Sequence, residues 1–186
     1  MTLRFLSKIF LVCAVLCAAT SARAADGFTL SSPDYAEGAT LREAQVYAGF
    51  GCSGGNQSPA LTWDNPPAGT QSFALTLYDP DAPTGSGWWH WVVFDIPADV
   101  RALPLDAAGT GALPAGAVQS LTDFGAPGFG GACPPEGDKP HRYIFTLYAL
   151  DVPKLGLDAG TMPAMVGFTL AGHTLGKAVL TTHYGR

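Results

Sequence analysis

The sequence has few charged residues and no excess of positive charge. Asp, Glu, Lys and Arg make up 13% of its 186 residues, and the formal net charge is −5. A field of that sign repels nucleic acid, so we expect no nucleic-acid partner. The GxxxxGK[ST] phosphate-binding loop is also missing from the sequence, which argues against a P-loop nucleotide enzyme. Hydrophobic residues reach 47%, so we do not expect extended disorder.

The one long apolar run lies at the N-terminus. Residues 9–19 are uninterruptedly apolar, follow the basic residues Arg4 and Lys8, and precede the small-x-small site Ala22–Ala24. This pattern is typical of a secretory signal peptide. A membrane-spanning helix needs about 20 apolar residues, so we expect no stable membrane insertion. The sequence therefore predicts a signal peptide over 1–24, a single domain over 25–186, and a periplasmic or secreted product.

Removal of the signal changes both the charge and the cysteine count. The mature chain would keep 7 basic and 15 acidic residues, a net of −8. Of four cysteines, Cys13 and Cys17 leave with the signal, while Cys52 and Cys133 remain. In an oxidising compartment an even number favours a disulfide, although two separate buried thiols are the alternative.

Glycine and proline are abundant and follow no period. With 23 Gly and 15 Pro, the chain has the turns of a protein built from short strands. Alternating or β-branched segments predict strands, and apolar spacing at 162–175 predicts a helix. The predicted strands are 28–31, part of 40–50, 60–63, 72–79, 88–96, 141–150 and 177–184. Residues 101–140 have little periodicity. The pattern predicts a mostly β fold with one or two short helices.

Candidate binding residues gather around two of these strands. Asp79 begins a rigid acidic corner, Asp79-Pro80-Asp81-Ala82-Pro83, and the next strand carries His90. His141 and Tyr143 open the later strand. If the strands at 88–96 and 141–150 are neighbours, these side chains share one rim, which suits a small anion such as phosphate.

Two further expectations concern the histidines of this site. Strict alternation places Trp89 and Trp91 on one face of their strand, and His90 with Trp88 on the other. We expect Asp79 to orient one imidazole. A nearby carboxylate raises a histidine pKa, so affinity for an anion should be greatest at mildly acidic pH.

Two segments resemble a known family. Residues 79–97 (DPDAPTGSGWWHWVVFDIP) and 137–150 (GDKPHRYIFTLYAL) resemble the signature regions of the phosphatidylethanolamine-binding protein family, also called the Raf kinase inhibitor-like family. Residues 50–63 and 128–135 look like its exported bacterial branch. The resemblance implies two packed, largely antiparallel β-sheets and a small pocket for anions and phosphorylated head groups.

The resemblance also implies which residues act. The ligand-binding residues would be Asp79, Pro83, Trp88, His90, His141 and Tyr143, and Asp81 with Arg142 would form a supporting ion pair. We expect a non-enzymatic binding protein with no cofactor, and we lean towards a homodimer. Eukaryotic relatives line the pocket with a C-terminal helix, whereas this chain ends at Arg186, so a more open pocket is expected. The alternative is an interaction protein, kinase- or protease-inhibitor-like, whose surface carries the function.

Three other motifs invite functional interpretations. Gly51–Gly55 fits the G-x-S-x-G nucleophile elbow around Ser53, but a strand rather than a helix is predicted to follow, so we expect a chance match. His90, His141 and Asp79 could form a two-histidine, one-carboxylate metal site, but no close ligand spacing supports one. Asn56-Gln57-Ser58 matches the pattern of a glycosylation acceptor, but we assign it no function because the signal peptide is of a bacterial type.

Overall fold

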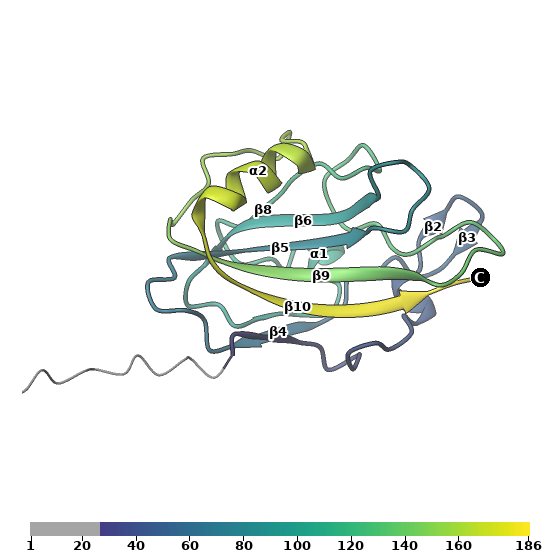
Figure 1. Ribbon diagram of the computed structural model, residues 1–186, viewed down its shortest axis with the longest axis horizontal. Coiled ribbons are helices and arrows are strands. Elements are labelled where there is room, and N and C mark those ends of the chain that lie inside the picture. Colours follow the sequence, from purple (N-terminus) through teal and green to yellow (C-terminus); the bar gives the residue numbers. More distant parts are fainter. Residues whose placement is uncertain (1–26) are drawn as a thin grey trace, which may run out of the picture.

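The computed structural model describes residues 27–186 of the chain (Figure 1). The predicted signal peptide at 1–24 and the predicted mature start at Ala25 lie outside the described residues. Over residues 27–186, we find no helix with both the length and the apolar character needed to cross a membrane.

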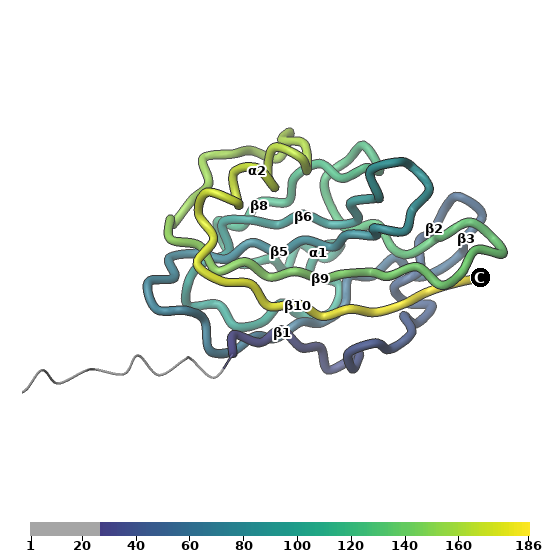
Figure 2. Tube along the Cα trace, in the orientation of Figure 1, coloured from purple at the N-terminus to yellow at the C-terminus, as the bar shows by residue number. Residues whose placement is uncertain are grey.

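The main sheet has five antiparallel strands in the order β10-β9-β5-β6-β8. In chain order they are β5 (Ser72–Asp79), β6 (Trp88–Pro97), β8 (Val118–Gln119), β9 (His141–Leu150) and β10 (Thr174–Tyr184). Almost every residue of β5 is buried, because both faces of the sheet are covered. Figure 2 shows the long strands lying side by side.

A second, three-stranded antiparallel sheet packs on one face of the main sheet. It has the order β1-β4-β7 and comprises β1 (Thr29–Ser31), β4 (Leu61–Asp64) and β7 (Ala102–Leu103). The core between the two sheets holds large side chains from both, among them Trp63, Phe73 and Phe145. The rings of Trp63 and Phe73 lie 5.6 Å apart in an edge-on arrangement, which aromatic pairs favour.

Helix α2 (Pro163–His173) covers the other face of the main sheet (Figure 1). Val166 and Leu170 pack there against Val92 and Phe94. Four small elements complete the fold: the hairpin strands β2 (Ala48–Gly49) and β3 (Cys52–Ser53), the 3-10 helix η1 (Glu43–Gln45) and the short helix α1 (Ala107–Thr110). The structure thus confirms the mostly β class with two packed antiparallel sheets.

Some predicted boundaries differ from the observed ones. The predicted strand within 40–50 is mostly wrong, because the 3-10 turn η1 precedes the two residues of β2. The predicted helix at 162–175 ends at His173, and β10 begins directly at Thr174 rather than at Lys177. Residues 101–140 form only β7, α1 and β8, as their prolines and glycines indicate.

A bulge in β6 overturns the prediction that Trp89 and Trp91 share a face. Between the pairs Leu77–Trp91 and Tyr78–Trp89, β5 advances by one residue while β6 advances by two, so His90 is the extra residue. Trp91 lies in the core between the sheets, whereas Trp89 packs beside the α2 cluster. The bulge breaks the alternation and brings His90 to the side of the sheet away from α2.

Candidate functional site

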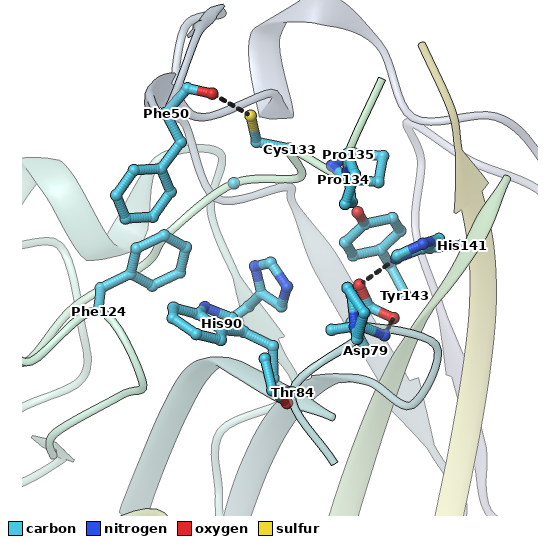
Figure 3. Close-up of a pocket in the computed structure, with 14 residues that line it drawn as sticks. Phe50, Asp79, Thr84, His90, Phe124, Cys133, Pro134, Pro135, His141 and Tyr143 are labelled. Carbon is cyan, nitrogen blue, oxygen red and sulfur yellow. Dashed lines mark hydrogen bonds and ion pairs between the residues drawn. The ribbon is translucent and has the colours of Figure 1, made fainter. Parts of the chain in front are cut away.

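A pocket of about 140 Å³ lies where β5 ends and where β6 and β9 begin (Figure 3). Its lining combines a few polar groups with aromatic and proline side chains. The lining residues are Phe50, Asp79, Ala82, Pro83, Thr84, Trp88, His90, Phe124, Gly131, Cys133, Pro134, Pro135, His141 and Tyr143. All six side chains that the sequence proposed as ligand-binding therefore surround one cavity. That they bind a ligand stays a prediction.

Strand order explains why these residues meet. We expected a shared rim on the condition that β6 and β9 are neighbours, and this condition is not met, because β5 lies between them. The residues still converge, since both neighbours run antiparallel to β5. The end of β5, which carries Asp79, therefore lies beside the starts of the strands that carry His90 and His141.

Asp79 orients the ring of His141. Its Oδ2 lies 2.8 Å from His141 Nδ1, and both side chains are at most 5% exposed. The other oxygen, Oδ1, accepts the backbone N–H groups of Asp81 at 2.8 Å and Ala82 at 3.1 Å. The carboxylate is thus fully used by the protein itself. It fixes the rigid corner and holds one imidazole, as expected, and the ring it holds is that of His141.

Asp81 and Arg142 form an ion pair beside the pocket, outside its lining. Arg142 Nε donates to Asp81 Oδ2 at 2.9 Å, and Nη2 donates to Oδ1 at 2.7 Å. The hydrogen bonds from the guanidinium lower the pKa of Asp81 to about 2. The pair joins the acidic corner to β9, which is the supporting position that the sequence indicated.

His90 is buried and has a depressed pKa. Its Nδ1 lies 2.8 Å from the backbone oxygen of Gly130, so Nδ1 carries the proton and Nε2 is free of one in the neutral ring. Burial lowers the pKa of His90 to about 4, against a smaller raising effect of the Asp79 charge. Our expectation of a raised pKa is therefore wrong for His90, because desolvation outweighs the carboxylate.

Three polar atoms around the pocket have no partner among the described residues. They are His90 Nε2, Trp88 Nε1 and the Tyr143 hydroxyl, and all three are buried. Burial, together with the nearby Asp79 charge, raises the pKa of Tyr143, so its phenol keeps its proton and can donate. An unpaired buried polar group costs about 1–3 kcal/mol, so three of them at one cavity point to an external partner.

The wall opposite these strands comes from loops to which we assigned no ligand-binding residue from the sequence. Asn56, which we interpreted only as a glycosylation pattern, donates to Phe129 O at 3.3 Å and accepts from Gly131 N at 2.7 Å. Together with the hydrogen bond from His90 to Gly130 O, these bonds fix the backbone of three consecutive residues, 129–131. Asn56 has a φ of 51°, a left-handed conformation that Asn tolerates better than most residues. The position of this Asn next to glycines was the one sequence signal that could have indicated its structural role.

Two further links fix this wall. Cys52 and Cys133 form a disulfide with a Cα–Cα distance of 6.0 Å, joining β3 to the pocket lining across 81 residues. The guanidinium of Arg186 donates to Pro134 O at 2.7 Å and to Gly51 O at 3.2 Å. Arg186 thereby ties the hairpin tip to the wall.

The structure also bears on the other motifs. Ser53 ends β3, is exposed, and is followed by seven residues without secondary structure and then by β4 rather than by a helix, so the nucleophile-elbow context is missing. Within residues 27–186, no group of three or more His, Cys, Asp or Glu side chains is placed to hold a metal ion. Asp79 and His141 pair with each other instead.

Comparisons with known proteins agree with this geometry. Residues 31–185 match the family described as phosphatidylethanolamine-binding protein. The chain is 50% identical to Escherichia coli UPF0098 protein YbcL over 180 residues, covering 95% of this chain and 98% of that one. Its identity to Escherichia coli YbhB is 51% over 156 residues, covering 83% and 98%. A Mycobacterium tuberculosis protein, LppC, which is named as a lipoprotein, is 37% identical over 163 residues, covering 88% and 75%.

Solved structures give the same result. The crystal structure of Escherichia coli YbcL, described as a member of the mammalian PEBP family, matches with a TM-score of 0.83 and 51% identity, covering 86% of this chain and 98% of that one. A PEBP homologue from Chlamydia trachomatis, CT736, matches with a TM-score of 0.73 and 29% identity, covering 86% and 97%.

Proposed function

The chain belongs to the phosphatidylethanolamine-binding protein family, and we propose that it is a non-enzymatic binding protein whose pocket takes a small anionic, phosphate-bearing ligand. The observation that carries the proposal is the set of three buried, unpartnered polar atoms around one cavity. Trp88 Nε1–H and the Tyr143 hydroxyl are donors, which phosphate oxygens accept.

Pocket size limits the ligand. Sites for drug-sized molecules usually occupy about 300–1,000 Å³, and a cavity of about 150 Å³ holds a benzene-sized molecule. The cavity of about 140 Å³ therefore suits a phosphate group or a short head group. The rest of a larger ligand would stay outside.

Binding should be linked to a proton, because neutral His90 offers an acceptor rather than a donor. A monoprotonated phosphate can donate its own hydrogen to Nε2. A fully ionised phosphate needs His90 to take up a proton, and the bound charge would raise the His90 pKa from about 4. For a phosphate monoester such as phosphoethanolamine, either route makes affinity fall as pH rises above the pKa at which the ester loses its last proton, which keeps the expected preference for mildly acidic pH for a different reason.

Two observations favour export. The Cys52–Cys133 disulfide is typical of an oxidising compartment, and one relative, LppC, is named as a lipoprotein. We therefore propose that the protein acts in the periplasm or outside the cell. Mass analysis of the secreted or periplasmic fraction tests cleavage after Ala24.

Calorimetric titration of inorganic phosphate and phosphoethanolamine at pH 5.5 and 8 tests the pocket. Tyr143→Phe removes one hydroxyl, and losing a hydrogen bond to a charged group costs about 1.5–3 kcal/mol, so affinity should fall about ten- to hundredfold. His90→Ala should have an effect at least as large. His173→Ala changes a half-exposed histidine on α2 and should bind like wild type. If both pocket variants also bind like wild type, the proposal is wrong.

A protein-binding role is the second candidate, and one observation favours it. Helix α2 and the residue before it expose Met162, Met165 and Phe168 at 62%, 53% and 79%, and Pro163–Gly172 contains no charged residue. An exposed apolar patch of this kind can meet a protein, including a second copy, because an uncharged face avoids repulsion between acidic chains. Wild-type protein that binds neither phosphate compound would favour this candidate.

A further inference from the structure

Phe50 occupies a backbone position that disfavours phenylalanine. Strands β2 and β3 pair Gly49 with Cys52, which leaves Phe50 and Gly51 as a two-residue hairpin loop. Their φ angles are 54° and 83°, both in the left-handed region. Hairpin loops with two positive φ angles prefer Asn, Asp or Gly at the first position, and a bulky residue there is strained.

The ring of Phe50 gains little burial in return. It is 67% exposed, although it lines the mouth of the pocket. Its nearest aromatic neighbours are Tyr47, with ring centroids 5.3 Å apart, and Phe124, at 6.0 Å with planes 11° apart. Figure 3 shows Phe50 and Phe124 together on the side of the pocket away from Asp79 and His141. Strain combined with exposure at a site indicates a functional rather than a packing role.

The surrounding contacts hold this ring in place. Phe50 O and Gly51 O accept from the Arg186 guanidinium at 3.4 Å and 3.2 Å. Cys133 Sγ lies 3.6 Å from Phe50 O, and this is a van der Waals contact, because a disulfide sulfur has no hydrogen to donate. The hairpin tip is therefore tied to the wall, and the ring offers a preformed apolar surface at the mouth.

The backbone at Gly130 leaves space for the ring of Phe124. A Cβ on Gly130 would collide with the Phe124 ring, so the glycine allows the ring to lie close over the backbone. Phe124 also meets Trp88 edge-on at 5.4 Å and His90 at 5.5 Å. The apolar surface of Phe50 and Phe124 is thus continuous with the polar interior of the pocket.

We propose that Phe50 determines ligand specificity, by selecting anions whose phosphate carries an apolar substituent over inorganic phosphate. The phosphate would enter the small cavity, and its aryl or alkyl group would lie against the rings of Phe50 and Phe124 at the mouth. This inference rests on the proposed function, and it adds a preference that the polar residues alone do not give.

The test compares three probes: inorganic phosphate, phenyl phosphate and hexyl phosphate. In wild type, at least one ester should bind more tightly than inorganic phosphate. Phe50→Asn keeps a residue suited to a positive φ and removes the ring, so the preference should shrink about three- to tenfold, as for a lost aromatic contact. Affinity for the esters should fall more than affinity for inorganic phosphate, and the ratio between the two isolates the contribution of the ring.

A matched variant and the contrary outcomes complete the design. Phe168→Asn removes another exposed ring, on α2, and should leave all three affinities unchanged. If Phe50→Asn keeps the wild-type preference, or if wild type shows none, the inference fails while the phosphate pocket stands. If wild type binds none of the probes, the proposed function and the inference both fail. The two esters separate an aromatic from an aliphatic preference.

Discussion

The pocket has two sides that are built in different ways. We call Asp79, His90, His141 and Tyr143 the strand side, because they stand on β5, β6 and β9 of the main sheet. We call the lining residues of the opposite wall the loop side: Phe50, Phe124, Gly131, Cys133, Pro134 and Pro135. Ladder hydrogen bonds fix the strand side, whereas the loop side depends on a disulfide, on Asn56 and on Arg186.

The two sides therefore contribute different properties to the pocket: the strand side supplies its polar groups, and the loop side supplies much of its apolar surface. The strand side carries the groups that can pair with a charged ligand, at positions set by the sheet register. The loop side is mostly apolar and is held by a few individual contacts, so it can change in sequence without disturbing the sheet. Two relatives that share the same strand-side residues could therefore differ in ligand preference through their loop-side residues alone.

Opening the disulfide, which is a link of the loop side, should produce the largest effect. In the chain-entropy account, a cross-link closing 81 residues contributes about 4.5 kcal/mol to the free energy of unfolding. Urea unfolding of a Cys52→Ala, Cys133→Ala double variant measures the loss. Hydrogen exchange should quicken throughout the molecule, and more around Gly131 than in β5 and β9, because the wall also loses a local contact. An unchanged free energy of unfolding would show that the other contacts suffice.

Removing the Asp79 carboxylate should be nearly as costly, on the strand side. Asp79→Ala leaves the buried His141 ring and two backbone N–H groups without their acceptor. Breaking a buried pair in this way typically costs about 3–5 kcal/mol. Chemical denaturation with Asp81→Ala as the control measures it. If both variants lost the same free energy of unfolding, the greater burial of the Asp79 carboxylate would not add to its contribution to stability.

His90 links the two sides, since its ring stands on β6 and bonds to Gly130, and it should give a pH dependence of intermediate size. Its folded pKa of about 4 lies below its ordinary value of 6.5, so the unfolded chain binds more protons between these values. Stability should therefore be fully present above pH 6.5 and fall as the pH drops towards 4. At 1.36 kcal/mol per pKa unit, the loss is at most about 3 kcal/mol.

Comparison with His90→Gln isolates that contribution. Denaturant midpoints at pH 4, 5.5 and 7 should fall more steeply in wild type than in the variant, whatever their absolute values. Parallel slopes would contradict the depressed pKa. Imidazole NMR signals provide a second measurement, since His90 should keep its neutral Nδ1–H form at pH 5.5.

The smallest effect should come from the Asp81–Arg142 pair, which lies just outside the pocket. Its side chains are 32% and 51% exposed, so solvent screens the attraction. Asp81→Asn should shift Tm by less than about 4 °C at neutral pH. Because the folded pKa of Asp81 is about 2, below its ordinary 3.8, the contribution is present above pH 3.8 and is lost as pH falls through 2. A shift larger than that of Asp79→Ala would reverse the ranking.

The same division explains what the sequence could predict. The bounds of β5 and β9 follow from their alternation, and the residue set of the strand side follows from the resemblance, which names all four. The bulge at His90 did not follow, because an extra residue in a ladder has no periodic signature. Without it, Trp89 and Trp91 were placed on one face.

The loop side was much harder to predict. Its contacts join residues far apart in the chain, such as Asn56 with Gly131 and Arg186 with Pro134, and no local pattern encodes such distances. Cys133 was the exception, since oxidation chemistry and an even count paired it with Cys52. The strain at Phe50 became visible only once the two-residue loop was known.

The placement of β10 has a consequence for how the protein folds. Its last residues pair with the early segment at 38–41, through bonds such as Leu41 N–H to His183 O, and the Arg186 side chain then donates to Gly51 O at the pocket mouth. Contacts between the two ends of a chain are slow to form, because a long loop must close first. A ribosome-bound or half-translocated chain that lacks Arg186 therefore cannot complete the wall of the pocket.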